Sequence, residues 1–340
     1  MTLAQPQQPR ELVTRQSPVD TAYAWVTRTG GSVALVVMLV IGGFLLSRAA
    51  VALKEAGWSF LTTAEWQPSG GSFGIAAILT GTVLVGLTAI SVALPLSLAT
   101  SLYISEYAPV RIKRLLVNLV DLMAAVPSVV YGLWGAFLLQ RQVLVQDASG
   151  AGLPRWLATY LGWIPIFRVE QDGERIAPGD LSASATSFTG SMFIAGLIVA
   201  LMVAPIATSI MRESFSQAPL GEREGAYALG ATRWGMIRSV VLPFGRGGII
   251  GGTMLGLGRA LGETIAVFMV LSIAFDVKIR ILEVGGSTVS SLIALRFGEA
   301  TDFEISALMA AGLALFVLTL LVNTVAAAAI SRSRSGAVTG

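Results

Sequence analysis

Two opposite charges stand in an otherwise apolar stretch of the sequence. The stretch covers residues 247–275, reads GLGRALGETIAVFMV near its centre, and has Arg259 and Glu263 as its only charged side chains. A charge in the middle of a bilayer costs roughly 2.5–3.5 kcal/mol on insertion scales. Charged residues kept at such a position therefore indicate a function or a specific structural contact.

The chemistry that suits these residues is the passage of an anion. A guanidinium stays charged at any pH, and its fork of donors matches a tetrahedral oxyanion. We interpret Arg259 as part of an anion path, with Glu263 holding it until an anion arrives and then releasing it. The alternative is a buried ion pair that only fixes the register of the helix.

Ser128 is a further candidate for this path. It follows Pro127 in the sequence AAVPSVVYGLWG. A proline in a membrane helix frees backbone groups, which a transport pathway can use. The Ser128 hydroxyl would then donate a hydrogen bond to the passing anion. Alternatively, it bonds only to the preceding turn of its own helix.

A continuous helix would place both charges on a side that faces protein. At about 100° per residue, Glu263 lies about 40° from Arg259. Three glycines at four-residue spacing, Gly248, Gly252 and Gly256, share that side. Stripes of small residues mark close contacts between membrane helices. The pattern therefore predicts that this face packs against protein rather than lipid.

The composition of the whole chain is typical of a membrane protein. Its 340 residues are 54% hydrophobic and 13% charged, with a mean hydropathy of +0.74, whereas a soluble domain has about 25% charged residues. Six apolar runs reach the roughly 20 residues that a span needs. They cover residues 31–53, 73–104, 115–139, 189–211, 247–275 and 306–330. We therefore predict an all-α integral membrane protein with six transmembrane helices.

Residue usage excludes several classes of function. The chain has no cysteine and no histidine, which excludes disulfides, Cys/His zinc sites and catalytic triads that need an imidazole. None of its three lysines stands in a G-x-x-x-x-G-K-[ST] pattern, so the chain has no P-loop for ATP. Its basic residues are spread over loops and are not interleaved with aromatics, which argues against nucleic acid. We expect no metal and no cofactor.

The distribution of basic residues predicts the orientation. With the N-terminus inside, thirteen Lys and Arg residues fall on the cytoplasmic side and nine on the external side. This bias follows the positive-inside rule, so both termini are predicted to be cytoplasmic. The expected organisation is a cytoplasmic tail (1–30), a first transmembrane helix with an external loop (31–72), a core of five transmembrane helices (73–330) and a second cytoplasmic tail (331–340).

An external segment of about 140–188 follows the third span. Its apolar part, GLPRWLATYLGWIPIF, predicts a short amphipathic helix at the membrane face. The segment is too short for a domain with its own core. A cap over the outer mouth, a docking surface for an external partner and a passive loop are all compatible with it.

The loop at about 212–246 has the pattern of a helix, a turn and a second helix. Pro219 suits the start of the first helix, and Gly230 suits the left-handed position that ends it. The second helix is expected to run to Pro243, just before the fifth span. A short helix held outside the bilayer could transmit a movement of a soluble partner to the membrane helices.

This loop resembles the EAA loop of ABC importer permeases. The residues are Glu224-Gly225-Ala226, three residues, Gly230, nine residues and then Val240-Val241-Leu242-Pro243. The family pattern is E-A-A, three residues, G, nine residues and I-x-L-P, from which Gly225 and Val240 depart. In that family the loop forms a coupling helix that inserts into a groove of the ATPase subunit. The resemblance implies that coupling role for Glu224, Ala226, Gly230, Leu242 and Pro243.

Three further stretches resemble one branch of that superfamily. The sequences GRALGET, ALPLSLATSLYISEYAP and AAVPSVVYGLWG are similar to those of the larger permease subunit of phosphate-specific ABC importers, over most of residues 73–330. The resemblance implies a type I importer fold in the bacterial inner membrane and inorganic phosphate as the cargo. It also implies a second homologous permease subunit, two ATP-binding subunits that hydrolyse ATP, and an external phosphate-binding protein. The chain itself would catalyse no reaction.

Two other functions are compatible with the residues. The cargo could be another oxyanion, such as sulfate or molybdate, or a polar organic solute carried by the same mechanism. The chain could instead be a secondary transporter in which Glu263 carries a coupling proton. The loop at 224–243 argues against the second, because a proton-coupled carrier needs no contact with an ATPase.

Overall fold

The computed structural model describes residues 17–144, 152–171, 174–175 and 188–334, and this part of the chain is mostly helical. Four of its helical stretches are long and apolar enough to cross a membrane. They are α1 (Pro18–Ala56), α3 (Ala76–Leu102) with the π-helical turn η2 (Tyr103–Tyr107), α7 (Met192–Ser216) and α14 (Asp302–Arg334).

Two bent pairs of helices bring the number of candidate spans to six. One joins α4 (Val110–Ala125) to α5 (Ser128–Trp134) and η3 (Gly135–Leu144), with a bend of 90°. The other joins residues 233–244 to α11 (Arg246–Gly262), with a bend of 65°. The predicted all-α membrane protein is confirmed, although these two spans are broken rather than straight.

The remaining elements are short. They are α2 (Ser59–Thr62), η1 (Pro68–Gly70), α6 (Leu153–Leu161), η4 (Pro165–Phe167), α8 (Leu220–Ala228), α9 (Arg233–Met236), η6 (Ile237–Val241), α10 (Leu242–Phe244), α12 (Ile265–Val270) and α13 (Val289–Arg296). Two antiparallel hairpins pair β1 (Trp66–Gln67) with β2 (Ser72–Phe73) and β3 (Glu170–Gln171) with β4 (Glu174–Arg175), so that Trp66 lies opposite Phe73 and Glu170 opposite Arg175.

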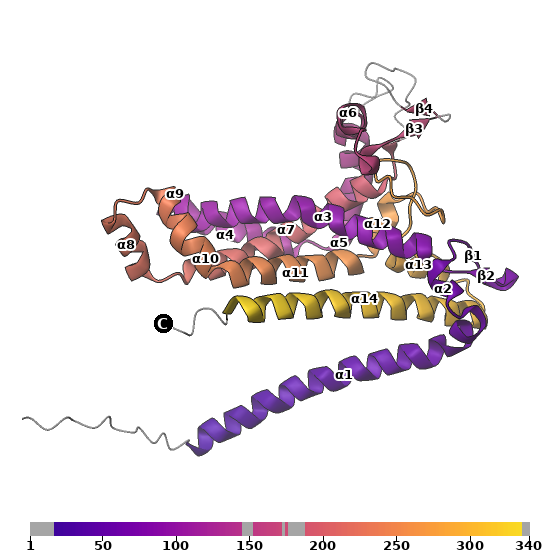
Figure 1. The fold of residues 1–340 in the computed structure, drawn as a ribbon, viewed down its shortest axis with the longest axis horizontal. Helices are drawn as coiled ribbons and strands as arrows, with labels where there is room; N and C mark the ends of the chain where they lie inside the picture. Colours follow the sequence, from indigo (N-terminus) through magenta and orange to yellow (C-terminus); the bar gives the residue numbers. More distant parts are fainter. Residues whose placement is uncertain (1–16, 145–151, 172–173, 176–187, 335–340) are drawn as a thin grey trace, which may run out of the picture.

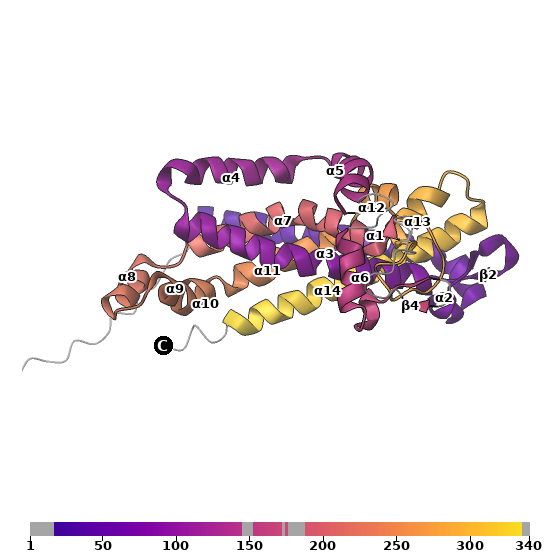
Figure 2. The ribbon, with the colours of Figure 1, turned by 90° about the horizontal axis from the view of Figure 1, so that it is seen from above.

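The long helices run between two ends of the molecule (Figure 1). One end carries α8, α9 and α10, and the other carries α6 and the two β-hairpins. Helix α1 begins, and α14 ends, at the end that carries α8. Figure 2 shows α4 along the edge of the bundle, and α4 has no buried residue.

Helix α1 begins earlier than the apolar run indicates. Pro18 is its first residue, and Ser17 caps it in a reciprocal capping box with Asp20. These capping residues start the helix within the segment that was expected to be a tail. Near its other end α1 buries Ala49 and Ala52 in a cluster with α14, while apolar side chains along the rest of it are exposed.

Helix α7 lies at the centre of the main core and is the partner of the glycine stripe. A Cβ atom added at Gly256 would lie 2.6 Å from the Val203 Cγ1 atom, and one at Gly252 would lie 3.1 Å from the Ala207 carbonyl oxygen. Only glycine permits so close an approach of α11 to α7. The prediction that the stripe packs against protein is confirmed.

Candidate functional site

The fifth predicted span is not one helix. Helix α11 ends at Gly262, and Glu263 has an extended backbone with φ −68° and ψ 129°. Helix α12 starts at Ile265 and ends at Val270. The prediction of a continuous helix over 247–275 is therefore wrong, because a helical wheel drawn from Arg259 does not extend past Gly262.

This break also separates the two charges. The Glu263 side chain is buried, and its Oε1 atom accepts a hydrogen bond from the Ala266 backbone N–H at 3.3 Å. The carboxylate thus caps the start of α12. No ion pair joins it to Arg259 in the described part of the chain. The predicted pairing of Arg259 with Glu263 is wrong, because the extended backbone at 263 turns the carboxylate toward α12.

The predicted path residues nevertheless line one hollow. Arg259 is exposed in the last turn of α11, and Ser128 is the first residue of α5. Between them lies an open cavity of about 460 Å³. Its lining residues are Ser128, Arg259, Gly262, Glu263, Thr264 and Ile265. The fold therefore brings together a serine and an arginine that lie far apart in the sequence.

Two helix breaks create this hollow. Val126 and Pro127 are both extended, which starts α5 afresh at Ser128. Pro127 has no N–H to donate to the Met123 carbonyl, which accepts hydrogen bonds from the Val126 backbone N–H at 3.3 Å and from the Tyr131 hydroxyl at 3.0 Å. Helix α5 packs against α12 so closely that a Cβ added at Gly132 would lie 2.8 Å from the Ala266 Cα atom. The breaks at 127 and at 263 are thus held side by side.

The hollow lies deep along α11. Arg259 is thirteen residues beyond Arg246, where the helix begins, which corresponds to about 20 Å at 1.5 Å per residue. The hydrocarbon core of a bilayer is about 30 Å thick. A guanidinium and a serine hydroxyl at this depth supply the donors that a desolvated oxyanion needs.

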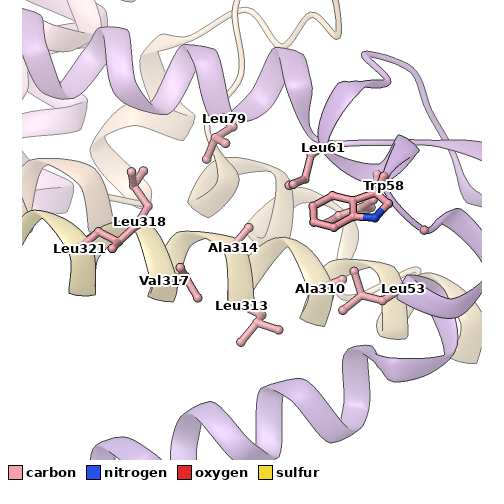
Figure 3. Close-up of a pocket in the computed structure, with 12 residues that line it drawn as sticks. Leu53, Trp58, Leu61, Leu79, Ala310, Leu313, Ala314, Val317, Leu318 and Leu321 are labelled. Carbon is pink, nitrogen blue, oxygen red and sulfur yellow. The ribbon is translucent and has the colours of Figure 1, made fainter.

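A second cavity has a different character. It has a volume of about 580 Å³ and lies between α14, α3 and the end of α1 (Figure 3). Its lining contains no charged side chain, and half of its twelve residues are leucines, such as Leu79, Leu313 and Leu318. Its larger volume therefore does not make it a path for an ion, because an ion requires polar partners.

The loop between the fourth and fifth spans forms the expected helix–turn–helix. Pro219 is the N-cap residue of α8, and Gly230 has φ +83°, the left-handed conformation expected of it. Thr232 caps α9 by accepting a hydrogen bond from the Gly235 N–H at 3.1 Å. The second helix extends past Pro243, which is exposed, to Phe244 in α10, so the predicted end is one residue early.

The predicted coupling residues fall into two groups. Glu224 and Gly230 are exposed at the end of the molecule. Ala226 and Leu242 are half-buried and pack against a cluster formed by the ends of α7 and η6. Beside Glu224, helix α8 and its turn expose large apolar side chains, with Leu229 91% exposed. Exposed apolar side chains that gather on one element are typical of protein–protein contact surfaces.

A comparison with known families identifies the chain. Residues 92–335 match the model of the binding-protein-dependent transport system inner membrane component. The chain belongs to this family. It is a transport permease of the ABC class.

Curated relatives extend the match over most of the permease. The phosphate transport system permease protein PstC 2 of Mycobacterium tuberculosis is 39% identical over 302 residues, which covers 88% of this chain and 87% of the relative. The phosphate transport system permease protein PstC of Mesorhizobium japonicum is 35% identical over 333 residues, covering 96% and 94%.

Solved structures show the fold. A bacterial alginate ABC transporter in complex with an alginate-bound periplasmic protein has a TM-score of 0.56 at 16% identity, covering 91% of this chain and 94% of that chain. A second alginate ABC transporter structure has a TM-score of 0.53 at 18% identity, covering 94% and 100%. The permease therefore has the fold of a type I ABC importer permease.

The segment that follows the third span is joined to the loop after α12 by ion pairs. Arg280 Nη1 lies 2.9 Å from Glu170 Oε2 and 3.0 Å from Glu283 Oε1, and Arg168 lies 2.7 Å from Glu170. The hydrogen bond to Glu283 raises the pKa of Arg280 above its ordinary value. Residues 145–151, 172–173 and 176–187 of the predicted segment lie outside the described residues.

Sequence reasoning missed a buried carboxylate at the opposite end. Glu106 in η2 is 7% exposed, and both of its carboxylate oxygens lie 3.0 Å from Arg223 Nη1 of α8. The signal was present in the sequence YISEYAP, where a single acidic residue closes the second apolar run. A charge at the end of a span is usual at the membrane interface, so its burial could not be foreseen.

Proposed function

We propose that this permease is the transmembrane subunit of an ATP-driven importer of inorganic phosphate and forms half of its translocation pathway. The support for phosphate comes from the relatives, which are 34–39% identical over 81–96% of this chain and are named phosphate permeases. The observation that carries the pathway is the hollow in which Arg259 and Ser128 face a common space.

In this pathway Arg259 meets the anion. Its guanidinium is exposed in the hollow and has no acceptor in the described part of the chain. Ser128 donates a hydrogen bond from the other helix break. Glu263 has a different role from the one its spacing indicates: it fixes the start of α12. Its charge at the rim also repels the anion and keeps binding weak, which favours release.

The second half of the pathway comes from a homologous permease subunit. The hollow at Arg259 is open to its surroundings, and α4 along the bundle edge buries no residue within this chain. A second subunit packed against α4 and over the hollow closes it. We also propose the division of the chain into a cytoplasmic tail (1–30), a first transmembrane helix with its loop (31–72), a permease core (73–330) and a second tail (331–340).

The remaining partners are placed at the two ends of the molecule. One of the two ATP-binding subunits docks on α8 and its turn, where Glu224, Ala226, Gly230, Leu242 and Pro243 form or support the contact, and the other docks on the homologous permease subunit. The first residue of α1 and the last residue of α14 lie at the same end of the molecule as α8 (Figure 1), which supports cytoplasmic termini in the bacterial inner membrane. An external phosphate-binding protein delivers its anion at the opposite end.

The test is uptake by vesicles that contain the full complex, with ATP inside and the binding protein outside. Labelled phosphate is expected to accumulate and labelled sulfate is not. Accumulation of sulfate instead would reassign the cargo. Transport driven by a proton gradient, without ATP-binding subunits, would contradict the transporter class and favour Glu263 as a proton carrier.

A further inference from the structure

The buried carboxylate of Glu106 lies where several cytoplasmic elements meet. It belongs to η2, the π-helical turn that ends α3. Its side chain is 4% exposed, and that of its partner Arg223 is 16% exposed. A buried carboxylate held by one guanidinium nitrogen at 3.0 Å to both oxygens is a strong, charge-assisted contact.

Arg223 also holds the end of a second membrane helix. Its Nη2 atom donates to the Phe215 carbonyl at 2.5 Å, and its Nε atom donates to the Ala218 carbonyl at 3.2 Å. These carbonyls lie at and just beyond the end of α7, and the Phe215 carbonyl also accepts a hydrogen bond from the Ala218 backbone N–H at 3.2 Å. One guanidinium from α8 therefore ties together α7 and η2.

A second arginine from the same loop binds the same turn. Arg233 of α9 donates a hydrogen bond to the Glu106 carbonyl oxygen. Its guanidinium also stacks over the Tyr107 ring, 4.7 Å from the ring centroid. Both helices of the coupling loop are thus attached to η2.

Helix α3 connects this turn to the anion hollow. A Cβ added at Gly86 would lie 2.8 Å from Leu261 Cδ2, so α3 touches α11 two residues from Arg259. Gly86 and Glu106 are twenty residues apart, which corresponds to about 30 Å along a helix. Leu261 directly precedes Gly262, which lines the hollow, so a displacement of η2 along the helix axis would be passed to the end of α11 beside the hollow.

We propose that Glu106 and Arg223 form the joint through which the coupling helix α8 moves α3. They are positioning residues: they make α8, η2 and the end of α7 move as one body, so that motion of the ATP-binding subunits reaches Arg259. This inference rests on the proposed function. Because breaking a buried ion pair is costly, the contact is expected to hold while α8 moves, so that the movement is passed to α3.

The test compares single and double variants in the full complex. Glu106→Gln and Arg223→Gln are each expected to lower the number of phosphates taken up per ATP hydrolysed by about fivefold, in the range of measured coupling changes. The ATP-binding subunits are expected to stay bound. Glu106→Gln/Arg223→Gln is expected to be no worse than the more affected single variant, because both residues act through one contact.

Two substitutions at the same end serve as matched controls. Glu213 is exposed near the end of α7, and Arg238 is exposed in η6. Glu213→Gln and Arg238→Gln are expected to take up as many phosphates per ATP hydrolysed as the wild type. The proposal would be wrong if Glu106→Gln took up as many phosphates per ATP as the wild type, or if the effects of the two single variants multiplied in the double variant.

A conservative variant covers the case in which the glutamines prevent assembly. Arg223→Lys keeps the charge but cannot reach a carboxylate and two carbonyls at once. It is expected to assemble fully and still lower the ratio. A wild-type ratio in this variant would contradict the proposal.

A reporter that does not depend on the cargo separates this proposal from the proposed function. The chain has no cysteine, so Thr264→Cys introduces one thiol at the rim of the hollow. Its labelling rate is expected to change with ATP in the complex and to be insensitive to ATP when Glu106→Gln is added. If phosphate uptake failed while the labelling rate still responded to ATP, the proposed cargo would be wrong but the proposed joint would not be affected. An ATP response that persists in Glu106→Gln would count against the joint alone.

Discussion

Arg223 and Arg259 are two arginines of one permease in opposite situations. Arg223 is largely buried and donates to the Glu106 carboxylate and to the Phe215 and Ala218 carbonyls. Arg259 is exposed in a hollow and has no acceptor in the described part of the chain. The first guanidinium has its hydrogen-bonding capacity used by the fold. The second carries the same capacity to a place where only a ligand or a partner subunit can use it.

The two buried carboxylates differ in the same way. Glu106 and Glu263 have similar exposure, at 7% and 8%. Glu106 binds a guanidinium, whereas Glu263 binds a backbone N–H and leaves the nearby Arg259 free. Proximity in the sequence is therefore a poor guide to ion pairing, because the backbone conformation decides which way a carboxylate points.

The largest expected effect is that of Arg259→Gln on uptake. Glutamine keeps polarity but removes the charge, and loss of a charge-assisted contact of up to about 3 kcal/mol corresponds to a loss of uptake of about 100-fold. The measurement is initial phosphate uptake by vesicles with matched amounts of assembled complex.

Arg259→Lys and Arg238→Gln complete this experiment. Lysine keeps the charge without the fork, so intermediate uptake is expected. Arg238 lies outside the hollow, and its glutamine variant should transport normally. Normal uptake by Arg259→Gln would reduce Arg259 to a structural residue and remove the contrast with Arg223.

The second effect is on stability, where the variant of Arg223 is expected to lose more than the variant of Arg259. Arg223→Gln leaves the buried Glu106 charge without its partner and is expected to destabilise the permease by about 3 kcal/mol. Arg259→Gln breaks no contact within the chain and should leave stability unchanged. Thermal unfolding of the purified complex in detergent measures both. Equal midpoints for the two variants would show that burial does not distinguish these arginines.

The third effect concerns the turn between α8 and α9. Gly230 has φ +83°, and a β-branched side chain there adds strain of about 1–2 kcal/mol. Gly230→Val is expected to uncouple ATP hydrolysis from transport or to release the ATP-binding subunits, as co-purification and stimulated ATPase activity would show.

Gly225→Ala is the matched control for this turn. Gly225 is helical, and an added Cβ meets no atom within 4 Å. Alanine is also the better helix former, by up to about 1 kcal/mol, so this variant should couple normally. Stimulated hydrolysis that survives in Gly230→Val would show that the turn is not part of the coupling contact.

The sequence was sufficient for features that depend on local chemistry. Apolar runs of sufficient length located every long helix, the glycine stripe identified the packed face of α11, and Gly230 marked a left-handed turn. These signals succeed because the number of consecutive apolar residues, the absence of a side chain and a positive φ each have one dominant structural solution.

The sequence was insufficient where distant segments decide the outcome. The break at Glu263 has no proline in the run to announce it, and it depends on how α12 packs against α5. The burial of Glu106 depends on Arg223, 117 residues away. Pairings of this kind are set by tertiary contacts. The sequence therefore predicted which residues line the hollow, such as Ser128, Arg259 and Glu263, but not how they are arranged.

The smallest expected effect is at the end of the molecule that carries α6 and the β-hairpins. Arg280 joins Glu170 and Glu283 with its side chain 32% exposed, and partly exposed ion pairs contribute about 0.2–1 kcal/mol. Arg280→Gln should therefore lower the unfolding midpoint only slightly. Because salt near 1 M shortens the screening length to about 3 Å, the difference from wild type should shrink at high salt, whereas the buried Arg223 contact should be much less sensitive. A loss for Arg280→Gln that equals that of Arg223→Gln and persists in high salt would mean that the external segment is locked as firmly as the coupling loop.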